Sequence, residues 1–308
     1  MILSASRRTD IPAFYSEWFF NRLQAGFVDV RNPMNIHHVS RIEISPDVLD
    51  CIVFWTKNPS PMLERINELS RFNFYFQFSV NPYSVEIEKN VPIKKEIINT
   101  FIRLSDIIGA GKVVWRYDPI LLSPHINIEY HIKYFEKLAR RLSGYTNRCV
   151  ISFIDLYKKT ISNTKDLCIQ ELKEDEMRLV ARRIEEIAFS YGIKVQSCSE
   201  SIELSDLGID HGCCIDKELI EEICGYKIDA KKDKNQRKEC GCIESVDVGA
   251  YNTCLHKCAY CYANYSSEKV AQQSRLHNPK SSMIIGELNQ KDVIKIKDVR
   301  LLKTKTLF

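Results

Sequence analysis

The sequence predicts an α/β protein built as a single β/α barrel, full or partial, of parallel strands. Short apolar runs rich in β-branched and aromatic residues alternate with longer amphipathic stretches, which is the pattern of buried strands joined by helices. Such alternation gives parallel sheets with right-handed crossovers, and six or more units favour a barrel over an open sheet. Polar residues recur where the apolar runs end, and a cysteine-rich stretch comes late in the chain. Both observations favour a functional site at one mouth of the barrel.

The predicted elements follow in order along the chain. Six apolar runs predict strands, at 1–6, 51–56, 72–80, 112–117, 149–154 and 193–198. Four amphipathic stretches predict helices, at 61–72, 94–111, 129–144 and 173–192. Gly109, Gly144 and Gly192 end three of these stretches and suit helix C-caps. Segment 27–45 interrupts the alternation and predicts an inserted hairpin.

The chain divides into three parts of different character. We expect residues 1–200 to form the barrel core, and 201–265 to complete the barrel and carry a cysteine-rich cluster-binding loop. Residues 266–308 are expected to form a basic C-terminal extension. Its last part, 291–308, has six basic and two acidic residues, which predicts an exposed edge strand or a short helix.

The composition is that of a soluble globular protein, with 308 residues, of which 44% are hydrophobic and 27% charged. The net charge of +4 permits an anionic substrate or nucleic acid without requiring either. The first residues lack the apolar region of a signal peptide, and no run of about 18 apolar residues occurs. We therefore expect a cytoplasmic protein with no membrane segment. In that reducing compartment, the twelve cysteines favour metal binding over disulfides.

Charged side chains lie at the ends of the predicted strands, where a β/α barrel places its active site. The residues that we expect to line a substrate pocket are Arg7, Arg8, Asp10, Lys57, Arg116, Asp118 and Asp155. The basic members favour a small substrate with a carboxylate or phosphate, because guanidinium groups bind such anions bidentately. The plainer interpretation is that strand ends meet loops and loops are polar. Repeated Arg and Asp within apolar runs favour the pocket.

The stretch YNTCLHKCAYCYAN, residues 251–264, contains Cys254, Cys258 and Cys261 with gaps of three and two residues. Thiolates that lie close in sequence allow one loop to hold an iron–sulfur cluster. Three thiolates bind three irons of a cubane and leave the fourth iron to a ligand from outside the protein. Zinc is the alternative, although a structural zinc site usually has two C-x2-C pairs at a longer separation.

The segment CLHKCAYC, residues 254–261, resembles the cluster loop of radical SAM enzymes, including the aromatic residue, Tyr260, before the third cysteine. The resemblance implies that the three cysteines hold a 4Fe-4S cluster whose open iron binds the amino and carboxylate groups of S-adenosylmethionine. It also implies a reductant such as a flavodoxin or ferredoxin. Reduction of the cluster would cleave the cofactor to a 5′-deoxyadenosyl radical, which abstracts hydrogen from a substrate.

A wider resemblance covers nearly the whole chain. The motifs that carry it are SASRRTDIPAFY, FWTKNP, WRYDPI, SFIDLY, CIDKELI, KDKNQRKECGC and SVDVGAYNTCLHKCAYCYAN. Together they resemble a bacterial and archaeal family, a domain of unknown function with a radical-SAM-like cysteine cluster at its C-terminus.

The chain departs from typical radical SAM enzymes in two respects. Their cluster loop follows the first barrel strand, whereas this loop follows five or six strand–helix units, with 243–251 as the strand that leads into it. We therefore expect a barrel in permuted order. The glycine-rich GGE stretch that contacts the cofactor is missing. Cofactor contacts would then come from strand ends such as Asn58, Ser79 or Asp118, and from Tyr260.

A second metal site is predicted from four further cysteines, Cys198, Cys214, Cys240 and Cys242. The family resemblance of CIDKELI favours Cys214 over its neighbour Cys213. Four thiolates suit an auxiliary 4Fe-4S cluster that relays electrons, or a tetrahedral zinc, and the alternative is that some are idle thiols. His211 and His256 lie near these cysteines, and we expect them to be solvated.

Three hypotheses follow for the function. The first is a radical SAM-like iron–sulfur enzyme that acts on an anionic substrate. The second is an iron–sulfur protein that does not use S-adenosylmethionine, either an electron carrier or a cluster-assisted lyase or hydrolase. The third is a zinc-stapled module that binds nucleic acid through the basic stretches 230–239 and 291–308.

Overall fold

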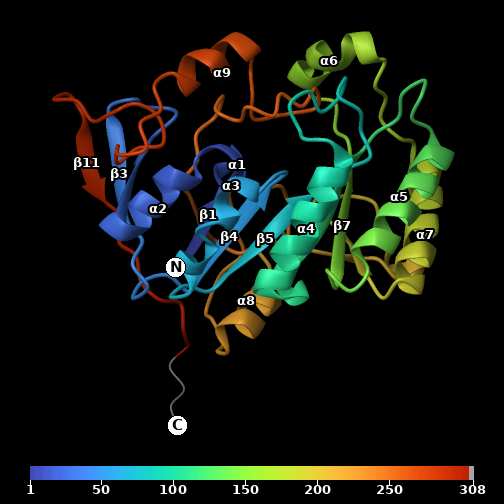
Figure 1. Cartoon of the computed structure of the whole chain (residues 1–308), viewed down its shortest axis with the longest axis horizontal. Coiled ribbons are helices and arrows are strands. Elements are labelled where there is room, and N and C mark those ends of the chain that lie inside the picture. Colours follow the sequence, from blue (N-terminus) through green and yellow to red (C-terminus); the bar gives the residue numbers. More distant parts are fainter. Residues whose placement is uncertain (305–308) are drawn as a thin grey trace.

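The computed structural model describes residues 1–304, apart from the side chains of residues 158 and 159, and contains one large and one small sheet (Figure 1). Every strand pair of the large sheet is parallel. From edge to edge its eight strands are β10 (Val246–Asp247), β1 (Ile2–Ala5), β4 (Cys51–Thr56), β5 (Phe74–Ser79), β6 (Val113–Ile120), β7 (Arg148–Phe153), β8 (Lys194–Ser197) and β9 (Asp210–His211).

The predicted α/β class and its parallel sheet are confirmed. All six predicted strands lie in the large sheet, and the segment before the cysteine-rich loop supplies β10, which pairs with β1. β10 and β9 are the two edges, and no strand pairing among residues 1–304 joins them. Strand pairing therefore gives an eight-stranded parallel sheet and does not close it into a ring.

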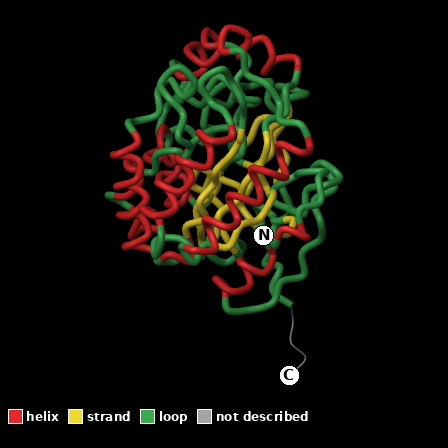
Figure 2. Tube along the Cα trace, turned by 90° about the vertical axis from the view of Figure 1, so that its right-hand side faces the viewer, coloured by secondary structure: helices red, strands yellow, loops and turns green. Residues whose placement is uncertain are grey.

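Helices surround the strands (Figure 2). They are α1 (Ile11–Phe14), α2 (Ser16–Ala25), α3 (Ser60–Leu63), α4 (Lys94–Ile108), α5 (Ile128–Leu142), α6 (Lys158–Thr164), α7 (Glu174–Ser190), α8 (Lys217–Cys224) and α9 (Ser267–Ser274). In Figure 1, α4, α5 and α7 lie beside the strands, α8 lies at one end of the sheet, and α6 and α9 lie at the other. Because α6 directly follows β7, the end with α6 and α9 is the end to which the strands point.

The predicted helices and their glycine C-caps are confirmed, with one exception. Gly109, Gly144 and Gly192 all adopt positive φ at or just after helix ends, as their predicted C-cap role requires. The stretch 61–72 is not one helix. It contains most of α3, followed by a 3-10 helix at Ile66–Leu69. In this second part, the backbone hydrogen bonds join residues that are three apart instead of four.

Alternate residues of the strands face two different cores. One face packs against the helices through large apolar side chains such as Phe54, Phe76 and Trp115. The other face is the interior, where the apolar side chains of β1, β4, β5, β6 and β7 meet the apolar side of α8. Cys198, Cys214, Cys240 and Cys242 belong to this interior core, and the cysteines of residues 251–264 do not.

The small sheet confirms the predicted hairpin. β2 (Phe27–Arg31) and β3 (His38–Glu43) pair antiparallel, and β11 (Val293–Ile296) adds to β3 in parallel. Part of the basic segment 291–308 is thus an exposed edge strand, one of the two predicted forms. Among the helices of residues 1–304, none combines the length and the apolar character needed to cross a membrane.

Candidate functional site

Hydrogen bonds hold the segment that leads into the cysteine-rich loop, residues 251–264, against the end of β1. Just before it, the Asp247 carboxylate accepts hydrogen bonds from Ser4 Oγ at 2.8 Å, Ser6 Oγ at 2.6 Å and the Arg7 backbone N–H at 2.9 Å. A Cβ atom on Gly249 would lie 2.0 Å from Ser6 Oγ. Only glycine fits where the chain passes from β10 into the loop.

The segment after β5 holds the middle of the loop. The Ala259 N–H donates to the Ile87 carbonyl at 2.9 Å, and the Asn90 N–H donates to the His256 carbonyl at 2.9 Å. The Asn264 side chain donates to the Cys254 carbonyl at 2.8 Å, which closes the loop on itself. Backbone and side-chain hydrogen bonds therefore both fix the position of the loop.

The three loop thiols, Cys254, Cys258 and Cys261, are half-buried and lie near one another. Burial raises the pKa of Cys254 well above its usual value, and the neighbouring Cys261 adds to the effect. Burial also raises the pKa of Cys258 to about 12, although Lys57 acts in the opposite direction. The pKa of Cys261 is raised for the same reason. Such thiols stay protonated until a cation compensates their charge.

Glu88 organises the side chains beside Cys258. Its buried carboxylate pairs with Lys57 Nζ at 2.8 Å and with Lys94, and it accepts the Tyr260 hydroxyl and the Asn81 amide. Burial opposes ionisation, but the two lysines outweigh it and lower the pKa of Glu88 to about 2. The Lys57 ammonium also lies 5.5 Å from the centre of the Tyr260 ring. The predicted residues Lys57 and Tyr260 are thus brought together next to the loop thiols.

Sequence reasoning missed Glu88. Two glutamates stand in VEIEKN, and Glu86 is exposed while Glu88 is buried. Nothing in the local pattern separates them, because the burial of Glu88 comes from contacts with Lys57 and Tyr260, distant in sequence.

Asp10 and His256 connect α1 to the loop. The Asp10 carboxylate caps α1 through the Ala13 N–H, accepts the Lys57 backbone N–H at 2.7 Å, and binds His256 Nε2 at 2.8 Å. His256 is 2% exposed, so the expectation of a solvated histidine is wrong. The centres of the His256 and Phe14 rings lie 4.6 Å apart. Asp10 therefore positions the loop.

Arg116 and Asp118 of β6 form a charged pair that contacts the interior core. The buried Arg116 guanidinium donates to the Asp118 carboxylate, and its Nη1 lies 2.9 Å from Cys214 Sγ. Asp118 also accepts the Ser152 hydroxyl from the next strand. Burial acts against the charge of Arg116, but Cys214 and Asp118 raise its pKa well above its usual value.

Four predicted residues lie further from the loop thiols or serve local structure. Asp155 is exposed and pairs with Arg237 of the charged 230–239 segment. Asn58 accepts the Ser60 N–H in a turn after β4. Arg8 stacks on the Tyr251 ring, and Ser79 lies beside Arg116 across β5 and β6.

Four buried polar atoms around the loop have no hydrogen-bond partner. They are Arg7 Nη2, Thr9 Oγ1, His256 Nδ1 and Asn264 Oδ1, here called the open polar atoms. Buried donors and acceptors are rarely left unpaired, and ordered water or a ligand completes those that the protein does not. Four of the six such side-chain atoms among the described residues belong to the loop or to the turn after β1.

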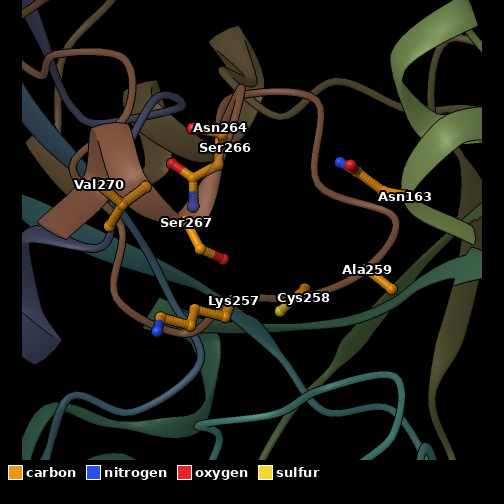
Figure 3. Close-up of a pocket in the computed structure, with 8 residues that line it drawn as sticks. All are labelled: Asn163, Lys257, Cys258, Ala259, Asn264, Ser266, Ser267 and Val270. Atoms are coloured by element: carbon orange, nitrogen blue, oxygen red, sulfur yellow. The ribbon is translucent and has the colours of Figure 1, made fainter.

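A cavity of about 220 Å³ opens beside the loop (Figure 3). Its lining is Asn163, Lys257, Cys258, Ala259, Asn264, Ser266, Ser267 and Val270. In Figure 3 the loop residues 257–259 and the residues from Asn264 onward lie on different sides of the opening, with Asn163 across from them. The lining contains one loop thiol and the residue that carries one open polar atom.

The predicted second set of cysteines is also brought together. We call Cys198, Cys214, Cys240 and Cys242 the interior thiols. Cys198 Sγ and Cys214 Sγ are 3.0 Å apart, and Cys242 contacts both Cys214 and Cys240. Cys213 Sγ lies against Gly241, the residue between Cys240 and Cys242, but it forms no hydrogen bond with the interior thiols. Within residues 1–304, no three His, Cys, Asp or Glu side chains already stand as they would around one bound ion.

Glu200, which follows β8, adds a group that titrates near neutrality. It accepts the Phe153 N–H at 2.8 Å. Burial, helped by the negative charges of Asp155 and Asp118, raises its pKa to about 7. Its place at a strand end could be read from the sequence, but its pKa depends on carboxylates from two other strands.

Comparison with known proteins identifies a family and finds distant structural likenesses. No curated protein matches the chain. A solved structure described as a "putative alpha-L-fucosidase" from Bacteroides thetaiotaomicron matches at 14% identity, over 58% of this chain and 74% of that one, with a TM-score of 0.27, too low to support an argument. The family described as "Domain of unknown function (DUF1848)" matches residues 2–263. The chain belongs to that family.

Proposed function

We propose that the protein is an iron–sulfur enzyme that resembles radical SAM enzymes, with the loop thiols holding a 4Fe-4S cluster at the mouth of a permuted β/α barrel. The observation that carries the proposal is that three half-buried thiols lie in one short loop, with open polar atoms on the loop itself and on the turn after β1. Thiols with raised pKa values become thiolates only when a cation compensates their charge, and unpaired buried donors and acceptors are completed by water or a polar ligand.

The residues present fit both groups. Three thiols from a single loop are the donor set of a cubane that keeps one iron open. The open polar atoms include a guanidinium nitrogen of Arg7 and an amide oxygen of Asn264. These suit the carboxylate and the amino group of S-adenosylmethionine, respectively. When bound, the cluster would supply the electron that cleaves S-adenosylmethionine to a 5′-deoxyadenosyl radical.

The chain's own residues hold the loop and shape the substrate side. Asp10 orients His256, and Glu88 fixes Lys57 and Tyr260 beside Cys258. On the other side, the partly exposed Asp118 is held by Arg116. Arg7 keeps a free guanidinium N–H, which favours an anionic substrate or cofactor group.

The test is anaerobic purification followed by measurement of iron and sulfide, and then incubation with dithionite and S-adenosylmethionine. We expect 5′-deoxyadenosine as the product. Cys258→Ala should abolish it, whereas Cys168→Ala should not, because Cys168 is exposed and lies far from the loop in sequence.

The other outcomes decide against the proposal. Iron and sulfide without 5′-deoxyadenosine from fully loaded, reduced protein would favour an iron–sulfur protein that does not use S-adenosylmethionine. Zinc alone would favour the zinc-stapled module.

A further inference from the structure

The interior thiols come from three separate parts of the chain. Cys198 directly follows β8, Cys214 lies just beyond β9, and Cys240 and Cys242 precede β10. All four are at most 8% exposed. Four thiols from distant positions do not converge in a buried core for packing alone, since apolar side chains would fill the same space without reactive groups.

We propose that the interior thiols bind a single metal ion as a tetrathiolate, separately from the loop thiols. With metal–sulfur bonds of about 2.3 Å, a tetrahedral site has sulfur–sulfur edges of about 3.8 Å. The 3.0 Å between Cys198 Sγ and Cys214 Sγ is shorter by under about 1 Å, so small outward side-chain movements admit the ion. A cubane would need each thiolate on a different iron and a much wider set.

Groups around the interior thiols match the charge of such a site. Four thiolates around a divalent ion carry a net charge of −2, and their thiol protons leave to solvent on binding. Arg116 Nη1 lies 2.9 Å from Cys214 Sγ, and the Arg7 guanidinium lies 5.4 Å from the centre of the Trp55 ring, which packs against the same interior core. One guanidinium group thus contacts, and a second lies near, a site whose expected charge is two negative units.

Second-sphere hydrogen bonds already hold the ligands in place. The Cys214 carbonyl accepts the Tyr75 hydroxyl at 2.7 Å and the Gln77 amide at 3.0 Å. The Ile215 N–H points at Cys242 Sγ at 3.4 Å. Such contacts orient metal ligands and stabilise thiolate charge.

A bound ion would connect the two edges of the large sheet. Cys214 follows β9 at one edge, and Cys242 leads to β10 at the other, where the Ile243 N–H donates to the Ile215 carbonyl at 3.2 Å. An ion shared by these segments would join the edges that strand pairing leaves apart.

The test uses the full chain with the loop thiols removed, as the variant C254A/C258A/C261A. Purified with added Zn²⁺, it should retain one metal ion per chain and no sulfide. Adding Cys242→Ser should abolish retention, and Cys213→Ser should leave it unchanged. Cys213 is the matched control because it adjoins Cys214 and lies beside Gly241, but its thiol forms no hydrogen bond with the interior thiols.

Cobalt substitution decides the ligand set even if the Cys242 variant does not fold. Co²⁺ added to the metal-free loop variant should give the intense ligand-field and charge-transfer bands of tetrahedral cobalt with four thiolates. A spectrum with fewer sulfur ligands, no retained ion, or four irons with sulfide would each overturn the proposal. Formation of 5′-deoxyadenosine is not measured here, so failure of the radical proposal leaves this result intact.

Discussion

At the scale of single residues, the Glu88 carboxylate connects four side chains beside Cys258. Lys57, Lys94, Tyr260 and Asn81 all bind its buried carboxylate. Removing one partner from a buried network of charges leaves the remaining charges buried and uncompensated. The position of Cys258 therefore depends on a carboxylate that is not itself a candidate ligand.

We predict that Glu88→Gln lowers the free energy of unfolding by about 3 kcal/mol, because two lysines lose their counter-charge. Urea denaturation at pH 7 measures this. Glu86→Gln is the matched control, since Glu86 lies on the same segment and is exposed. Equal stability of the two variants would contradict the role assigned to Glu88.

The same carboxylate predicts a pH dependence. Its pKa is lowered from 4.5 to about 2 in the folded protein, so the unfolded chain takes up the proton first as the pH falls. The stability from Glu88 is fully present above about pH 4.5 and is lost as the pH falls toward 2, by about 3 kcal/mol in total. Denaturation midpoints between pH 5 and about 3 should fall more steeply for the wild type than for Glu88→Gln.

At the scale of elements, the passage from β10 into the loop depends on one close approach. Gly249 lies against Ser6, and Asp247 binds both Ser4 and Ser6. β10 has only two residues, so these contacts rather than a long ladder hold it against β1.

We predict that Gly249→Ala costs about 1–3 kcal/mol, since an added Cβ at 2.0 Å from Ser6 Oγ forces the strands apart. Gly111→Ala should be nearly neutral, because its nearest neighbour lies 3.9 Å away. Thermal unfolding measures both changes. If the clash is the cause, Gly249→Ala should cost less stability in a Ser6→Gly background than in the wild type, and an equal cost in both backgrounds would contradict it.

Element prediction succeeded where pattern and end signals agree. The strand runs, the hairpin of β2 and β3 and the glycine C-caps follow from alternation and from φ preferences, which are local properties. The stretch 61–72 failed because its amphipathic pattern does not distinguish α-helical from 3-10 bonding. The place of β9 and β10 at the edges depends on tertiary pairing that no local signal encodes.

At the scale of the whole molecule, Asp50 joins three distant parts of the chain. Its fully buried carboxylate binds the Met1 ammonium, the Leu302 N–H at 2.9 Å and the Tyr226 hydroxyl at 2.9 Å. The beginning of β1, the segment after α8 and the C-terminal tail therefore meet at one carboxylate.

We predict that Asp50→Asn costs about 2–4 kcal/mol, because the buried ammonium loses its partner. Limited proteolysis should then cut near residue 302 faster than in the wild type. Asp47→Asn, at an exposed site in the same loop, is the control. Unchanged proteolysis in Asp50→Asn would show that the tail is held by other contacts.

The loop thiols and the pair Arg116 and Asp118 are close in sequence, whereas the interior thiols meet through tertiary contacts. Sequence reasoning named each of these groups, and the roles it gave them stay predictions. It missed Glu88 and expected a solvated His256, because both are buried by partners remote in sequence.

Arg7 allows the loop thiols and the interior thiols to be studied separately. Its backbone carbonyl accepts the Tyr262 hydroxyl at 2.7 Å, next to the loop thiols, while its guanidinium lies over Trp55, which packs against the interior core. Substitution of Arg7 removes the guanidinium and keeps the carbonyl. A neutral variant such as Arg7→Met thus separates electrostatic influence from mechanical tethering within a single residue.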